Sequence, residues 1–370
     1  MTPSGPNVVV YVDAEGNPLY TSTEGGQAAT SSSASASIVT ANVQKGHRWG
    51  QSTAATTTSV VVASTPAAST VIVASSAAAS TPAASSAAAA SSAAPAQSSA
   101  ASSGSSSGMN GISYSPYSGN VASGNVGCKT AAQVAADFAE IDSSKYNMVR
   151  IYGTDCNQVQ NVLAAAKPKG MKVFAGVYDI TQTASEIATI VAAANGDWSD
   201  FHTISIGNEL VNSGSATVSA VTSAISTARG LLSAAGYPGF VVTVDTFIAV
   251  ENNPALCQAS DYAAVNAHPY FDGGVAAANA GPWVLSQMQA VSSVCGGKNT
   301  MITETGWPWS GESNGQAIAS TANQAAAISS IKSTISSNLI MFTAFNDMWK
   351  SPGYLNVEQS WGMYGTSAAS

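Results

Sequence analysis

Charged residues are scarce in this chain. Among its 370 residues there are 12 Lys or Arg and 20 Asp or Glu, which gives a formal net charge of −8. Such a chain lacks the clustered positive charge that binds the phosphates of nucleic acid or an anionic membrane surface. We therefore expect no nucleic acid and no membrane as a partner, whereas a neutral partner needs no charge to attract it.

Cysteine is also rare. The four cysteines lie between Cys128 and Cys295, and none forms the C-x-x-C pair that is typical of zinc or redox sites. No trio of His, Asp, Glu or Cys has the spacing of a metal site, so we expect no metal and no cofactor. An even number of cysteines instead indicates disulfides in a secreted protein.

A secretory signal is not visible, because residues 1–27 have no basic segment followed by an apolar one. This conflicts with the cysteine argument, and we expect a misplaced or trimmed start, with unconventional export as the alternative. Residues 365–370 have no hydrophobic tail, so a GPI anchor is not expected. The sequence N-x-S/T does not occur, so we expect no N-glycans.

Composition divides the chain into three parts. Residues 1–27 form a short segment whose strand-like stretch, 8–19, is too small to build a core. Residues 28–108 are mostly Ser, Ala and Thr and bury too little apolar area to fold, which predicts a disordered stalk, either O-glycosylated or an unmodified spacer. Within residues 109–370, strand-like and helix-like segments alternate, which is typical of an α/β domain.

Eight strand-like segments in this domain predict a (β/α)8 TIM barrel, with helical apolar spacing between them. A doubly wound sheet is the rival fold, but Gly119, Gly124 and Gly127 do not have the spacing of its phosphate turn. Few residues follow Trp349, so the eighth helix should be short or missing. The predicted strands are 111–114, 148–152, 173–178, 203–207, 240–245, 263–267, 301–304 and 339–345.

In two of these segments a glutamate follows at or near the end of an apolar run. They read F-H-T-I-S-I-G-N-E, ending at Glu209, and M-I-T-E-T-G-W-P-W-S-G, which contains Glu304. An ionised glutamate is rarely buried without partners, so both carboxylates need an explanation. Two carboxylates that face one cleft are what glycoside hydrolysis requires. The alternative for each is a helix N-cap or a surface salt bridge.

Four motifs carry a family resemblance. R-I-Y-G at 150–153, G-N-E at 207–209, N-A-H-P-Y-F at 266–271 and E-T-G-W-P at 304–308 together resemble the glycoside hydrolase family 17 β-1,3-glucanases, most closely the fungal cell-wall branch. The resemblance covers the chain from Gly111 onward. It implies retaining, endo-acting hydrolysis of β-1,3-glucan by a secreted, monomeric cell-wall protein. Transglycosylation and a non-catalytic glucan-binding wall glycoprotein remain as alternatives.

The resemblance also implies a role for each polar residue of the site. Glu209 would be the general acid/base and Glu304 the nucleophile. Asn208 would bind the 2-hydroxyl of the reacting sugar, with a role as a turn residue as the alternative. An acid catalyst needs a raised pKa, which burial and the charge of the other glutamate would provide. The nucleophile must stay ionised, and Arg150 and Tyr270 are the candidates for holding it so.

Sugar rings stack their apolar faces on aromatic rings, so a glucan cleft should be lined by aromatic residues near strand ends. We expect His268 to have a structural role, in which it orients Tyr270 or the loop that carries it. Asp347 is a further candidate for binding a sugar hydroxyl. The other predicted substrate-binding residues are Tyr152, Tyr178, Asp245, Tyr270, Trp307, Phe345 and Trp349.

Strand order also predicts the disulfides. Cys128 and Cys156 follow the first and second strands, at the C-terminal face of a barrel, whereas Cys257 and Cys295 precede the sixth and seventh strands, at the opposite face. We therefore predict that Cys128 pairs with Cys156 and Cys257 with Cys295.

Overall fold

The computed structural model describes residues 7–12, 18–24 and 108–368. Strands β1 (Asn7–Val12) and β2 (Pro18–Glu24) pair antiparallel, so the short strand expected at the start of 8–19 has a second strand as its partner. The predicted stalk, 28–108, lies outside the described residues except at its last position. Within the described ranges, no helix has both the length and the apolar character needed to cross a bilayer.

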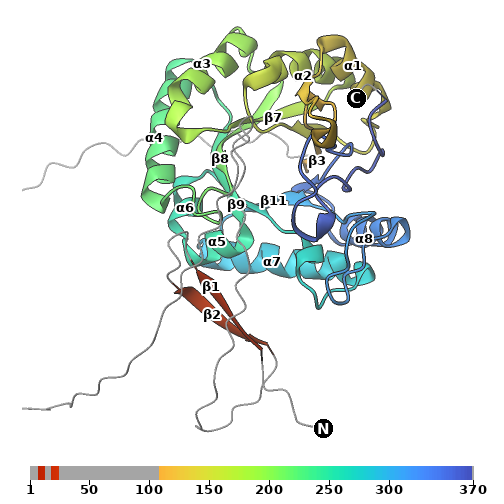
Figure 1. Ribbon diagram of the computed structural model, residues 1–370. Coiled ribbons are helices and arrows are strands. Elements are labelled where there is room, and N and C mark those ends of the chain that lie inside the picture. Colours follow the sequence, from red (N-terminus) through yellow and green to blue (C-terminus); the bar gives the residue numbers. More distant parts are fainter. Residues whose placement is uncertain (1–6, 13–17, 25–107, 369–370) are drawn as a thin grey trace, which may run out of the picture. The chain divides into compact units, whose positions relative to one another are not determined.

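Eight parallel strands close into a barrel, which confirms the predicted (β/α)8 fold (Figure 1). Neighbours in the chain pair with one another, and β12 pairs with β3 to complete the ring. Each strand overlaps the segment predicted for it, although the last is shorter than expected. The strands are β3 (Asn110–Ser113), β6 (Met148–Arg150), β7 (Lys172–Val177), β8 (Phe201–Asn208), β9 (Phe240–Thr246), β10 (Ala263–Asn266), β11 (Thr300–Thr305) and β12 (Leu339–Met341).

Helices surround the barrel on its outside (Figure 1). Two short helices after β9, α5 and α6, were not predicted, because segments of five or six residues are too short to show an apolar face. After β12 the described chain has only the 3-10 turn η7 (Tyr354–Asn356). This agrees with the prediction that the helix after the last barrel strand is short or missing. The helices are α1 (Ala131–Glu140), α2 (Gln158–Ala166), α3 (Thr183–Ala194), α4 (Val218–Ala234), α5 (Phe247–Asn252), α6 (Ala255–Ala259), α7 (Ala280–Val294) and α8 (Thr321–Thr334).

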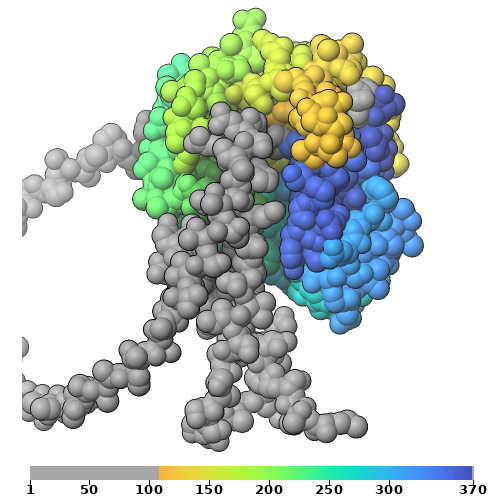
Figure 2. Space-filling model, viewed as in Figure 1, coloured from red at the N-terminus to blue at the C-terminus, as the bar shows by residue number. Residues whose placement is uncertain are grey.

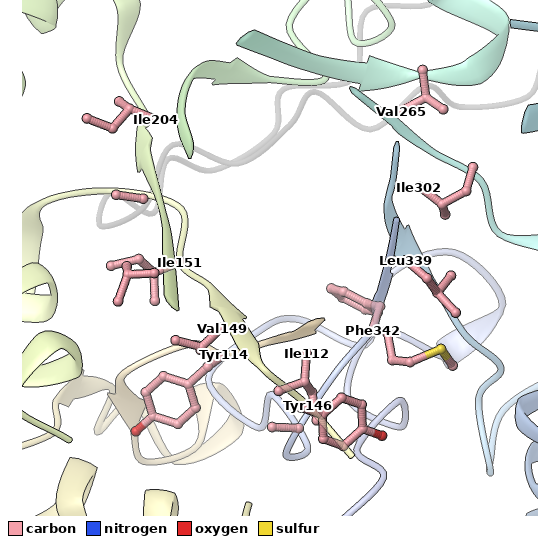
Figure 3. Close-up of a cluster of buried hydrophobic side chains, with 14 of the residues drawn as sticks. Ile112, Tyr114, Tyr146, Val149, Ile151, Ile204, Val265, Ile302, Leu339 and Phe342 are labelled. Atoms are coloured by element: carbon pink, nitrogen blue, oxygen red, sulfur yellow. The ribbon is translucent and has the colours of Figure 1, made fainter. Parts of the chain in front are cut away.

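Two apolar layers hold the barrel together, because successive residues of a strand point to opposite faces of the sheet. Side chains such as Ile204, Val265 and Ile302 point outward and belong to the cluster under the helices (Figure 3). A second cluster, which includes Phe174 and Val242, fills the inside. The buried charged side chains of the barrel strands, Arg150, Asp245 and Glu304, lie at or next to the C-terminal ends of β6, β9 and β11.

Both predicted disulfides are present, Cys128 with Cys156 and Cys257 with Cys295. The first ties the loop after β3 to the loop after β6. In Figure 2 the orange segment after β3 lies beside the dark blue C-terminal segment. Tyr117 and Trp349 make this contact, with ring centroids 4.7 Å apart. The C-terminal segment therefore packs against the segment that follows β3.

Candidate active site

The two glutamates lie where strands β8 and β11 lose their regular register. The pairing of β8 with β9 shifts between Ser205 and Asn208, and β11 shifts against both of its neighbours near Glu304. Such bulges turn a side chain to a new direction. Gly207 and Glu209 have left-handed φ values of 79° and 54°. At position 207 glycine is favoured, since φ is left-handed and an added Cβ would also lie 2.6 Å from Leu210 Cδ1.

Glu304 is buried among positively charged and polar groups. The Arg150 guanidinium, itself fully buried at the end of β6, donates from Nη1 to Glu304 Oε1 at 2.8 Å. The same nitrogen donates to the Thr303 carbonyl at 2.9 Å, which fixes the guanidinium in place. On the other side, His268 Nε2 lies 3.4 Å from Glu304 Oε2. His268 therefore contacts the nucleophile candidate, whereas the sequence indicated that it orients a neighbouring loop.

Asn266, at the end of β10, contacts Glu209 and also Arg150, which in turn contacts Glu304. Its Nδ2 donates to Glu209 Oε1 at 2.8 Å. Its Oδ1 accepts from Thr303 Oγ1 at 2.8 Å and from Arg150 Nη1 at 3.3 Å, which orients the amide. The sequence contained a signal for this residue, because Asn266 begins the N-A-H-P-Y-F motif, yet no role was assigned to it.

The environments of the two carboxyls move their pKa values in opposite directions. Burial, and then the charge of Glu304, raises the pKa of Glu209 to about 8. Burial also acts to raise the pKa of Glu304, but Arg150, His268 and Lys350 together outweigh it and lower that pKa to about 2. Near neutral pH one carboxyl is therefore protonated and the other ionised. A general acid must be protonated and a nucleophile must be ionised, so the two environments suit these two roles.

Two further predicted residues lie beside this pair. Asn208 Oδ1 accepts from Arg150 Nη2 at 2.8 Å, so its amide N–H groups, which have no protein partner in the described part of the chain, are available to a ligand. The Tyr152 ring lies 4.5 Å from the Arg150 guanidinium. Burial and the nearby charge of Glu304 raise the pKa of Tyr152, so its phenol stays protonated. Tyr178 is partly exposed, on the loop after β7.

The structure corrects the roles expected for several aromatic residues. Tyr270 and Trp307 are fully buried and pack edge to face, so neither offers a face to a sugar. The Tyr270 phenol donates to the Glu312 carbonyl rather than to Glu304. Phe345 and Trp349 are also buried, the latter against Tyr117. Tyr270 and Phe345 also pack against rings of the C-terminal segment, Trp361 and Tyr364 respectively.

Asp245 at the end of β9 has a structural contact in place of the expected sugar contact. Its carboxylate accepts from the backbone N–H groups of Val211 at 2.9 Å and Asn212 at 3.2 Å. It also accepts from the N–H of Thr246 at 2.9 Å. Because residues 211 and 212 follow Glu209 directly, Asp245 fixes the loop that presents this glutamate.

A (β/α)8 barrel with a protonated and an ionised carboxyl at the ends of two strands is typical of the glycoside hydrolase class. Comparison with known families agrees, because residues 111–362 match the BtgE/BtgC glycoside hydrolase domain. The chain belongs to this family.

Relatives come from several fungi. The chain is 53% identical over 260 residues to the cell surface mannoprotein MP65 of Candida albicans, a match that covers 70% of this chain and 67% of that protein. It is 51% identical to the probable family 17 glucosidase SCW10 of Saccharomyces cerevisiae, over 70% of this chain and 65% of that protein. The match to the probable β-glucosidase btgE of Aspergillus terreus is 37% identical and covers 69% of this chain but 46% of that protein. The chain thus spans about two thirds or less of these relatives.

Among solved structures, the barrel resembles a family 17 β-1,3-glucanosyltransferase from Rhizomucor miehei. The TM-score is 0.59 and the identity 25%, over 69% of this chain and 92% of that one.

Proposed function

We propose that this protein is a retaining endo-β-1,3-glucanase that acts on cell-wall glucan. The observation that supports this most is the pair of carboxyls with opposite protonation, Glu209 and Glu304, linked through Asn266 and Arg150. The family, and relatives named as family 17 glucosidases, favour a glucoside substrate. The name of the Candida relative favours a place at the cell surface.

In the proposed mechanism, Glu304 attacks the anomeric carbon while Glu209 donates its proton to the leaving oxygen. Arg150 keeps the attacking carboxylate ionised and correctly oriented. Asn208 binds the 2-hydroxyl of the reacting sugar through its free amide N–H groups. The glycosyl-enzyme then forms, and Glu209, now a carboxylate, takes a proton from the water that releases the sugar.

A second candidate is glucanosyl transfer, in which a sugar hydroxyl replaces that water. The resemblance to the Rhizomucor transferase favours it. Both reactions use Glu209 and Glu304 in the same way and differ in the acceptor alone. A non-catalytic wall protein is disfavoured, because binding does not require two carboxyls with pKa values that differ this much.

The test measures oligosaccharides released from a linear β-1,3-glucan by the wild type, Glu209→Gln and Glu304→Gln. Glu140→Gln, an exposed glutamate of α1, is the matched control. We expect both site variants to lose about 10²-fold or more in activity and the control to lose none. Products longer than the starting oligosaccharide would identify transfer, and the anomeric form of the first product, followed by NMR, tests retention. A wild type that binds glucan without changing it would refute the enzymatic proposal.

A further inference from the structure

Two aromatic rings are exposed on the loops beside the site, and no role has been assigned to them. Phe271, in the turn η5 (Pro269–Phe271) after β10, is 41% exposed, and Tyr354, in η7 after β12, is 68% exposed. Their ring centroids are 6.4 Å apart and the ring planes differ by 34°. Single exposed aromatic residues are common on protein surfaces, but these two neighbouring, tilted rings place their apolar surfaces close together.

This pair continues from the candidate active site. The Phe271 ring lies 6.1 Å from the His268 ring, centroid to centroid, and 5.8 Å from that of Trp361. His268 in turn contacts the Glu304 carboxylate. The contacts therefore run from Glu304 through His268 to Phe271, and from Phe271 to Tyr354.

The loop between β11 and α8 forms hydrogen bonds with both turns that carry these rings. Asn314 Nδ2 donates to the Phe271 carbonyl at 3.0 Å. Glu312 N–H donates to the Leu355 carbonyl at 2.8 Å, and its carboxylate accepts from Asn356 Nδ2. Leu355 and Asn356 have left-handed φ values of 56° and 55°, which are unfavourable for leucine in particular. These bonds hold an unfavourable backbone that leaves the Tyr354 ring exposed.

We propose that Phe271 and Tyr354 form an outer binding platform for the glucan chain, on which sugar units beyond the cleaved bond stack their C–H faces. The proposal rests on the proposed function for the identity of the substrate. Uncharged rings suit an uncharged polysaccharide. The platform would act on long chains and not on short ones, because short chains end before they reach it.

The first experiment compares wild type and Tyr354→Ala on β-1,3-gluco-oligosaccharides of three and of six sugars. We expect kcat/KM for the longer substrate to fall about 5- to 10-fold, as loss of one stacking contact predicts, with little change for the shorter one. Tyr354→Phe should retain the wild-type values. Phe240→Ala is the matched control, because Phe240 is 46% exposed but begins β9 at the opposite end of the barrel.

Calorimetric titration of the six-sugar oligosaccharide into Glu304→Gln, with and without Tyr354→Ala, measures binding without turnover. If the wild type does not cleave but Tyr354→Ala weakens this binding, the proposed function is refuted and the platform stands. If the wild type cleaves and Tyr354→Ala acts equally on both lengths, or has no effect, the platform is refuted and the function stands. An equal effect of Phe240→Ala would also overturn the platform.

Discussion

Replacing Arg150 by methionine removes the buried cation that contacts Glu304. The guanidinium donates to Glu304 Oε1 at 2.8 Å, and burial alone acts to raise the pKa of this carboxyl. Without Arg150 we expect the pKa to move from about 2 to above the ordinary value of 4.5. The difference corresponds to roughly 3 kcal/mol between the two protonation states.

The assay is the pH dependence of kcat/KM on a β-1,3-gluco-oligosaccharide. In the wild type, activity should fall below pH about 2, where Glu304 becomes protonated, and above about 8, where Glu209 loses its proton. In Arg150→Met the acid limit should move above pH 4.5, while the alkaline limit should change less. Arg229→Met is the control, because Arg229 forms its ion pair with Asp261, on the outer side of the barrel.

Stability provides a second measurement on the same variant. The pKa of Glu304 is lowered by folding, so its ionised form stabilises the wild type above pH about 4.5, and this stabilisation is lost as the pH falls toward 2. Breaking a buried ion pair costs about 3–5 kcal/mol, which chemical denaturation near neutral pH can measure. A folded Arg150→Met whose acid limit equals that of the wild type would refute the reasoning.

Three further predictions concern the acid side of the site. Glu209→Gln should raise the thermal unfolding midpoint at pH 7 but not at pH 4. Folding raises the pKa of this carboxyl from 4.5 to about 8, so the group destabilises the fold at pH values above 4.5, by up to about 3 kcal/mol at pH 7. A lower midpoint at pH 7 would contradict this. Gly207→Ala should destabilise by about 1–3 kcal/mol in denaturant unfolding, since φ is 79° and the Leu210 side chain fills the space. Asp245→Ala should lower kcat about 10- to 100-fold by freeing the loop after Glu209, and unchanged steady-state kinetics would exclude that role.

Much of the fold could be predicted because its signals are local. Each barrel strand is a short apolar run, and most helices show apolar residues at helical spacing, so the order of elements follows from nearby residues. Cys128 and Cys156 could be paired for a related reason, since strand order alone places both at one end of the barrel. The short helices α5 and α6 were missed because they are too brief to display a period.

The sequence by itself also determined that Glu209 and Glu304 end two strands, and therefore that they share one face of the barrel. The resemblance implied how each is charged, but only the tertiary structure decided that Arg150 and not Tyr270 contacts Glu304, since this ion pair joins residues 154 positions apart. It likewise decided that Tyr270 and Trp307 are buried whereas Phe271 and Tyr354 are exposed. Burial and pKa depend on contacts between distant segments, and no local pattern of residues records them.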